Sequence, residues 1–215
     1  MTITFGRMLT NHKESETQNR RTICNHTDID ADAAAAVSIM RKGGIILYPT
    51  DTVWGIGCDA TNADAVRRIY ELKRRVDHKA MIVLADSPEM MERHVVEIPE
   101  VALQLIDVAI RPTTIIYDQG CGLAHNLLGI DGSIGIRVTS ERFSAALCRK
   151  LRRPVVSTSA NISGQPSPKF FREISSEIIN GVDYVATYRR DDIEPHAPSC
   201  IIKLSNSGEV KIIRE

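Results

Sequence analysis

Short apolar runs rich in β-branched residues alternate along the chain with longer segments whose apolar residues recur at helical spacing. The short runs predict strands, and they cover residues 45–48, 81–85, 113–117, 134–138 and 154–157. The longer segments and their cap residues predict helices, one from Asp28 or Asp30 to Gly43, others over 62–75, 99–109 and 169–179, and two more that begin at Ser87 and Ser140. Two final strands, 200–204 and 209–213, flank a segment typical of a hairpin turn, Asn206-Ser207-Gly208.

This order of elements predicts an α/β fold. Strands that alternate with helices and end in an antiparallel pair are typical of an open mixed sheet with helices packed against it. The length of 215 residues fits one such domain. Residues 1–26 are polar and lack the apolar core of a secretory signal, so we predict a flexible N-terminal arm followed by one domain over residues 27–215.

Composition and charge narrow the class of protein. Lys and Arg number 27 and Asp and Glu number 27, so the net charge of zero gives no global attraction to nucleic acid. No apolar run approaches the roughly 20 residues of a membrane span. The five cysteines are scattered, without a C-x-x-C pair, which disfavours a disulfide framework or a zinc knot and favours a cytoplasmic protein.

Three polar segments lie beside predicted strand ends, where α/β proteins place their ligands. The segment LKRRVDHK carries Lys73, Arg74, Arg75 and Lys79, which form either a solvated helix end or a clamp for a polyphosphate. The segment TSANISGQPS offers hydroxyl and amide groups, either as turn caps or as ligands for phosphate or a purine. In PTDTVWGIG, the two glycines indicate a close backbone approach to a ligand or to a neighbouring strand.

Several common catalytic patterns are missing from the sequence. There is no G-x-x-x-x-G-K-[ST] motif, no G-x-G-x-x-G after a strand, and no G-x-S-x-G motif. The six histidines show no metal-ligand spacing, so we expect no built-in metal.

Taken in order, the loops resemble the YrdC-type threonylcarbamoyl-AMP synthases of the short, single-domain bacterial kind. The similarity rests on PTDTVWGIG, on Lys73, Arg75 and Lys79, on IGIRV around Arg137, and on PVVSTSANISGQPSP. It runs from about Lys42 to the C-terminus, although the W-P-G-P-x-T motif of the family is reduced here to Pro112 and Thr114. The resemblance implies a twisted, open α/β sheet around a large basic cavity.

The resemblance also implies a reaction in which L-threonine, bicarbonate and ATP give threonylcarbamoyl-AMP and pyrophosphate. Other proteins then transfer the threonylcarbamoyl group to tRNAs that read ANN codons. ATP would be a substrate, with Mg²⁺ on its phosphates, and Lys73 and Arg75 would be catalytic. Implied ATP ligands are Lys73, Arg75, Lys79, Thr114, Ser159, Asn161, Ser167 and Arg214, and implied threonine ligands are Thr52, Ser157, Ser199 and Arg137.

Two alternatives differ in class from this nucleotidyltransferase. The first is a protein that binds tRNA or double-stranded RNA without catalysis, because basic cavities of this family are also regarded as RNA sites. The second is a carbamoyl-phosphate-processing module, which normally belongs to a much longer chain with zinc-finger cysteines. The aromatic content of 5% speaks mildly against RNA binding as the main function.

Overall fold

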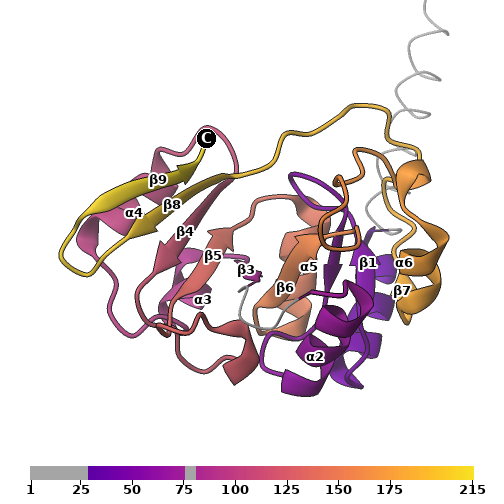
Figure 1. Cartoon of the computed structure of the whole chain (residues 1–215), viewed down its shortest axis with the longest axis horizontal. Helices are drawn as coiled ribbons and strands as arrows, with labels where there is room; N and C mark the ends of the chain where they lie inside the picture. Colours follow the sequence, from indigo (N-terminus) through magenta and orange to yellow (C-terminus); the bar gives the residue numbers. More distant parts are fainter. Residues whose placement is uncertain (1–28, 76–80) are drawn as a thin grey trace, which may run out of the picture.

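The computed structural model describes residues 29–75 and 81–215, and an open mixed sheet runs through its centre (Figure 1). Within these residues the sheet has nine strands in the order β7-β1-β2-β6-β3-β5-β4-β8-β9. Their bounds are β1 Ile46–Tyr48, β2 Gly55–Gly57, β3 Ile82–Ala85, β4 Thr113–Tyr117, β5 Ile134–Val138, β6 Val155–Ser159, β7 Tyr184–Val185, β8 Cys200–Leu204 and β9 Val210–Arg214.

Parallel and antiparallel pairs are both present, as the predicted α/β fold requires. The pairs β1–β7, β3–β5 and β4–β8 are parallel, and the other neighbouring strands are antiparallel. The first helix covers residues 29–41. The later helices are α2 Ala63–Leu72, α3 Pro88–Glu92, α4 Glu100–Asp107, α5 Arg142–Leu151 and α6 Ser176–Gly181, and two short 3-10 turns are η1 His125–Leu127 and η2 Phe171–Glu173. The predicted mixed open sheet with flanking helices is therefore confirmed.

Side-chain caps start several helices, as the sequence predicted. The side chain of Asn62 accepts hydrogen bonds from the backbone N–H groups of Asp64 and Ala65, and Ser87 caps α3. The prediction that Ser140 begins α5 was wrong by one residue, because the Glu141 carboxylate receives the first free N–H groups of the helix.

The segment 169–179 does not form the single helix that its pattern predicted. The 3-10 turn η2 ends at Glu173, and the backbone of Ile174 is extended. Ser175 then caps a new helix by accepting from the N–H of Ile178. Ile174 is buried, so packing of its side chain accompanies this break in the helix.

The short strands β2 and β7 were not predicted, and β6 runs two residues beyond its predicted end, to Ser159. The glycines of β2 explain why it was missed, since a strand without a β-branched run gives little signal. A Cβ atom on Gly57 would lie 2.4 Å from the carbonyl oxygen of Val156. The close approach expected at this glycine is thus made to a neighbouring strand, and not to a ligand.

The core is formed by apolar side chains from both sides of the sheet, with Tyr48 and Phe143 among the largest that are fully buried. In the part of the chain that the structure describes, every helix is too short or too polar to cross a membrane. The long connection from β7 to β8 crosses the width of the sheet, because these strands lie near its opposite edges (Figure 1).

Candidate active site

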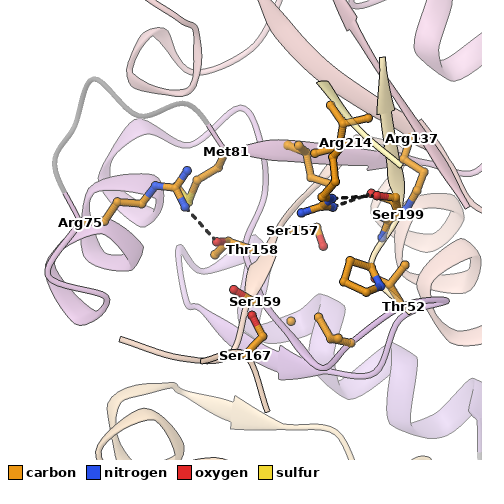
Figure 2. A pocket seen from close by; sticks show the side chains of 15 residues that line it. Thr52, Arg75, Met81, Arg137, Ser157, Thr158, Ser159, Ser167, Ser199 and Arg214 are labelled. Atoms are coloured by element: carbon orange, nitrogen blue, oxygen red, sulfur yellow. Dashed lines mark hydrogen bonds between the residues drawn. The ribbon is translucent and has the colours of Figure 1, made fainter. Parts of the chain in front are cut away.

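A cavity of about 350 Å³ opens on one face of the sheet and brings together most of the predicted site residues (Figure 2). Its volume lies near the lower end for small-molecule sites. The predicted residues that line it are Thr52, Arg75, Arg137, Ser157, Ser159, Ser167, Ser199 and Arg214. Lining residues that were not predicted as ligands are Val53, Gly55, Met81, Ile82, Thr158, Pro198 and Ile201.

Strand register places several of the lining side chains on one face of the sheet. Ser157 and Ser159 are two residues apart on β6, so they point to the same side of the sheet. Gly55 of β2 lies opposite Ser159, and Ile82 of β3 lies opposite Ser157. Small residues on β2 and β6 leave the sheet surface uncovered here, which makes room for a ligand.

Arg137 forms the deepest charged group of the cavity. Only 2% of the residue is exposed, and one of its terminal nitrogens lies 2.8 Å from an oxygen of Asp51. Its Nε–H is buried without a hydrogen-bond partner among the described residues. Burial lowers the pKa of this guanidinium, while the Asp51 carboxylate opposes that shift. Arg137 therefore retains a donor for an anionic ligand.

Arg214, Ser199 and Thr114 form a second polar cluster, which lies beside Arg137 and across the cavity from Arg75 (Figure 2). Arg214 donates from Nε to the carbonyl oxygen of Ser199 at 3.0 Å and from Nη2 to its hydroxyl at 3.3 Å. The Ser199 hydroxyl also lies 3.0 Å from that of Thr114. Thr114 is fully buried and does not line the cavity. It contacts the cavity lining through Ser199, which was itself predicted as a ligand.

Lys73 is buried and does not line the cavity either. Its ammonium group donates to the carbonyl oxygen of Ser159 and, at 2.6 Å, to that of Asn161. Burial, with the charge of Arg75, lowers the pKa of Lys73 to about 8. The amide of Asn161 in turn donates to the carbonyl oxygens of Ile162 and Gln165. Lys73 and Asn161 therefore shape the loop that follows β6.

Arg75 reaches the cavity from the end of α2, and Nη1 lies 3.4 Å from the Thr158 hydroxyl (Figure 2). Burial lowers the pKa of this guanidinium as well. Three guanidinium groups thus line one cavity, together with six hydroxyl-bearing residues, of which all but Thr158 were predicted as ligands. Such a set suits a ligand with several anionic oxygens.

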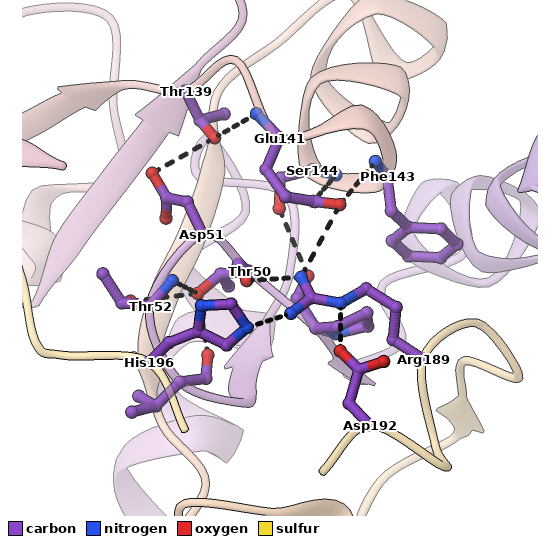
Figure 3. A network of polar contacts seen from close by, with 12 residues as sticks. Thr50, Asp51, Thr52, Thr139, Glu141, Phe143, Ser144, Arg189, Asp192 and His196 are labelled. Atoms are coloured by element: carbon purple, nitrogen blue, oxygen red, sulfur yellow. Dashed lines mark hydrogen bonds and ion pairs between the residues drawn. The ribbon is translucent and has the colours of Figure 1, made fainter. Parts of the chain in front are cut away.

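The loop between β1 and β2 forms another wall, and its conformation depends on Thr50 (Figure 3). The Thr50 hydroxyl accepts from the N–H of Thr52 at 3.0 Å and lies 3.0 Å from the Thr52 hydroxyl. It donates to the carbonyl oxygen of Val53 at 2.7 Å. These hydrogen bonds are typical of a turn, and Thr52 nevertheless lines the cavity.

Two predictions fall on residues outside the described ranges: the N-terminal arm and Lys79. Sequence reasoning missed Thr158 and the partnership of Asp51 with Arg137. A hydroxyl next to Ser157 and Ser159 was the only signal for Thr158. Among the described residues, no group of three or more His, Cys, Asp or Glu side chains is arranged to hold a metal ion.

Comparison with known proteins places this chain in a family. The family model Sua5_yciO_yrdC, described as "Telomere recombination", matches residues 38–215. A threonylcarbamoyl-AMP synthase of Pseudomonas aeruginosa is 36% identical over 138 residues, which are 64% of this chain and 74% of the relative. One of Xanthomonas campestris is 32% identical over 157 residues, 72% of this chain and 84% of the relative.

Solved structures of similar proteins have the same fold as this chain. E. coli YciO superposes with a TM-score of 0.75 at 25% identity, over 86% of this chain and 89% of that protein. P. abyssi Sua5 complexed with L-threonine gives a TM-score of 0.72 at 25% identity, over 81% of this chain. The chain spans about half the length of that Sua5, 51%. From the motifs, the sheet and these similarities, the chain belongs to the Sua5/YciO/YrdC family.

Proposed function

We infer that this chain is a threonylcarbamoyl-AMP synthase, an ATP-using nucleotidyltransferase that serves the threonylcarbamoyl modification of tRNA. The observation that carries this inference is the convergence of Arg75, Arg137 and Arg214 on one hydroxyl-lined cavity. The curated relatives from Pseudomonas aeruginosa and Xanthomonas campestris bear this enzyme name, and the match with them covers most of their length.

The proposed reaction needs charge neutralisation and alignment more than a nucleophilic side chain. The amine of L-threonine attacks the carbon of CO₂ and loses a proton, which gives a carbamate; when bicarbonate supplies the carbon, one of its C–O bonds breaks and water leaves. A carbamate oxygen then attacks the α-phosphorus of ATP, and the bond to the β-phosphate oxygen breaks as pyrophosphate leaves. Fixed cations lower the barrier by stabilising the charge that develops on the phosphoryl oxygens and on the leaving group.

We assign ATP to the side of the cavity formed by Arg75, Ser159, Ser167 and Arg214, and we keep Lys79 and Thr114 as proposed ATP ligands. Lys73 and Asn161 would act there through the loop after β6, because Lys73 holds the carbonyl oxygens of Ser159 and Asn161. Mg²⁺ would bind phosphate oxygens, which together with water are its usual ligands.

We assign L-threonine to the side formed by Thr52, Ser157, Ser199 and Arg137. Its carboxylate is the natural partner of the buried Arg137, whose Nε–H has no hydrogen-bond acceptor among the described residues. The P. abyssi Sua5 relative was crystallised with L-threonine. The product would pass to proteins that transfer threonylcarbamoyl to tRNA, and we place these steps in the cytoplasm, where ATP and tRNA are available.

The test is pyrophosphate release from ATP, measured with threonine and bicarbonate each omitted in turn. We expect release only with both present. Arg75→Ala should lower the rate by at least about a hundredfold, because a cation at the phosphates is lost. Arg74→Ala is the matched control, since Arg74 is exposed, pairs with Glu177 and does not line the cavity. Release without threonine, or equal rates in both variants, would contradict the proposed function.

A further inference from the structure

Arg189 lies in the connection from β7 to β8, and its guanidinium is held from several directions (Figure 3). Nη1 donates to the carbonyl oxygen of Thr50 at 3.0 Å, and Nε donates to the Asp192 carboxylate. Nη2 lies 2.6 Å from Nε2 of His196. The side chain is 17% exposed, and its backbone has a left-handed φ of +60°. A residue held in this uncommon conformation with so many contacts is fixed precisely in space.

The first contact bears on the loop that carries Thr52. Arg189 holds the carbonyl oxygen of Thr50, while the hydroxyl of the same Thr50 holds the N–H of Thr52. Pro49 is also fixed, because its carbonyl oxygen accepts from the Ser144 hydroxyl at the start of α5. The position of the Thr52 side chain in the cavity thus depends on the guanidinium.

The other contacts bear on the segment that carries Ser199. Asp192 and His196 follow Arg189 along the connection, and Pro198 and Ser199 come next and line the cavity. Since β7 and β8 lie near opposite edges of the sheet, this segment must pass the rim of the cavity. Arg189 ties the crossing segment to the loop between β1 and β2.

We propose that Arg189 is a positioning residue for the threonine side of the cavity, which it builds by joining the segments of Thr52 and Ser199. This inference rests on the proposed function, because it takes threonine as the ligand on that side. Lysine cannot replace the arginine, since a single ammonium group does not reproduce a planar fork that reaches Thr50, Asp192 and His196 at once.

The experiment compares the KM values for threonine and ATP in Arg189→Lys and in Arg190→Lys. Arg190 is the matched control, because its guanidinium donates to the carbonyl oxygens of Ala186 and Val185 and lies over the ring of Phe171, and among the described residues it makes no hydrogen bond to the segments of Thr52 or Ser199. We expect Arg189→Lys to raise the KM for threonine by about tenfold, the size of one charge-assisted hydrogen bond, with little change in the KM for ATP. Arg190→Lys should change neither value.

Calorimetric titration with L-threonine, which needs no turnover, separates the two proposals. If the wild-type protein releases pyrophosphate but Arg189→Lys binds threonine as the wild type does, the role of Arg189 is overturned and the function stands. If both KM values rise together with a fall in melting temperature, Arg189 is merely structural and the proposal is again overturned. If the wild type neither turns over nor binds threonine, the proposed function itself fails.

Discussion

At the scale of the residue, the buried ammonium group of Lys73 gives a prediction about pH. Its pKa of about 8 lies below the ordinary value of 10.5, because burial disfavours the charged form. If its charge supports the proposed reaction, the rate of pyrophosphate release should fall about tenfold per pH unit above pH 8. Lys73→Met should be slower at all pH values and should lack this alkaline decline.

Above pH 8 the contribution of Lys73 to the free energy of unfolding should rise while the rate falls, and this difference provides a check on the assignment to Lys73. Between pH 8 and the ordinary lysine pKa of 10.5, the unfolded chain binds more protons at Lys73 than the folded chain does. The contribution of this group to the free energy of unfolding therefore rises with pH. Urea denaturation at several pH values measures it. An alkaline loss of activity that persists in Lys73→Met would show that another group is responsible.

The sequence identified the types of residue at the site better than their contacts. Arg75, Ser159 and Ser167 could be predicted because each lies in a polar segment at or beside the end of a strand. The pair Arg137–Asp51 could not, since its members are far apart in the sequence and only the folded sheet brings them to 2.8 Å. Nothing in the residues around Arg189 indicates a partner at Thr50 for the same reason.

At the scale of the element, the pairing of β2 with β6 depends on a glycine. A Cβ atom at Gly57 would meet the Val156 carbonyl oxygen at 2.4 Å and the ring of Tyr48 at 2.7 Å. We expect Gly57→Ala to lower the free energy of unfolding by about 1–3 kcal/mol, because backbone must move to accept the methyl group. Gly55→Ala is the control, since its nearest contact would be an ordinary 3.4 Å. Equal losses in urea denaturation of the two variants would contradict this account.

Helices and strands with strong local signals were predicted, and those that depend on neighbours were not. Asn62 and Ser87 start their helices by accepting hydrogen bonds from backbone N–H groups a few residues ahead, and such cap residues can be recognised in the sequence. Strand β7, only two residues long, exists because it pairs with β1, and that pairing joins distant parts of the chain. The break in the helix at Ile174 likewise depends on neighbouring residues, because the side chain of Ile174 is buried where the helix stops.

At the scale of the whole molecule, the cavity draws its lining from strands across most of the sheet, from β2 to β9. A ligand bound there contacts elements that must separate on unfolding, so it should stabilise the described domain as one unit. At a hundredfold excess over its dissociation constant, a non-hydrolysable ATP analogue should add about 2.7 kcal/mol, or about 5–10 °C in melting temperature.

The edge strand β9 allows this idea of a single unit to be tested. Arg214→Ala should abolish most of the shift that the analogue produces, because Arg214 lines the cavity from the last strand of the sheet. Lys211→Ala should keep the shift, since Lys211 is exposed on the same strand and does not line the cavity. Calorimetry with two separate transitions, of which the analogue moves only one, would mean that the strands of the cavity do not unfold together. A single transition that moves in the wild type and in Lys211→Ala, but not in Arg214→Ala, would link ligand binding to the stability of the entire sheet.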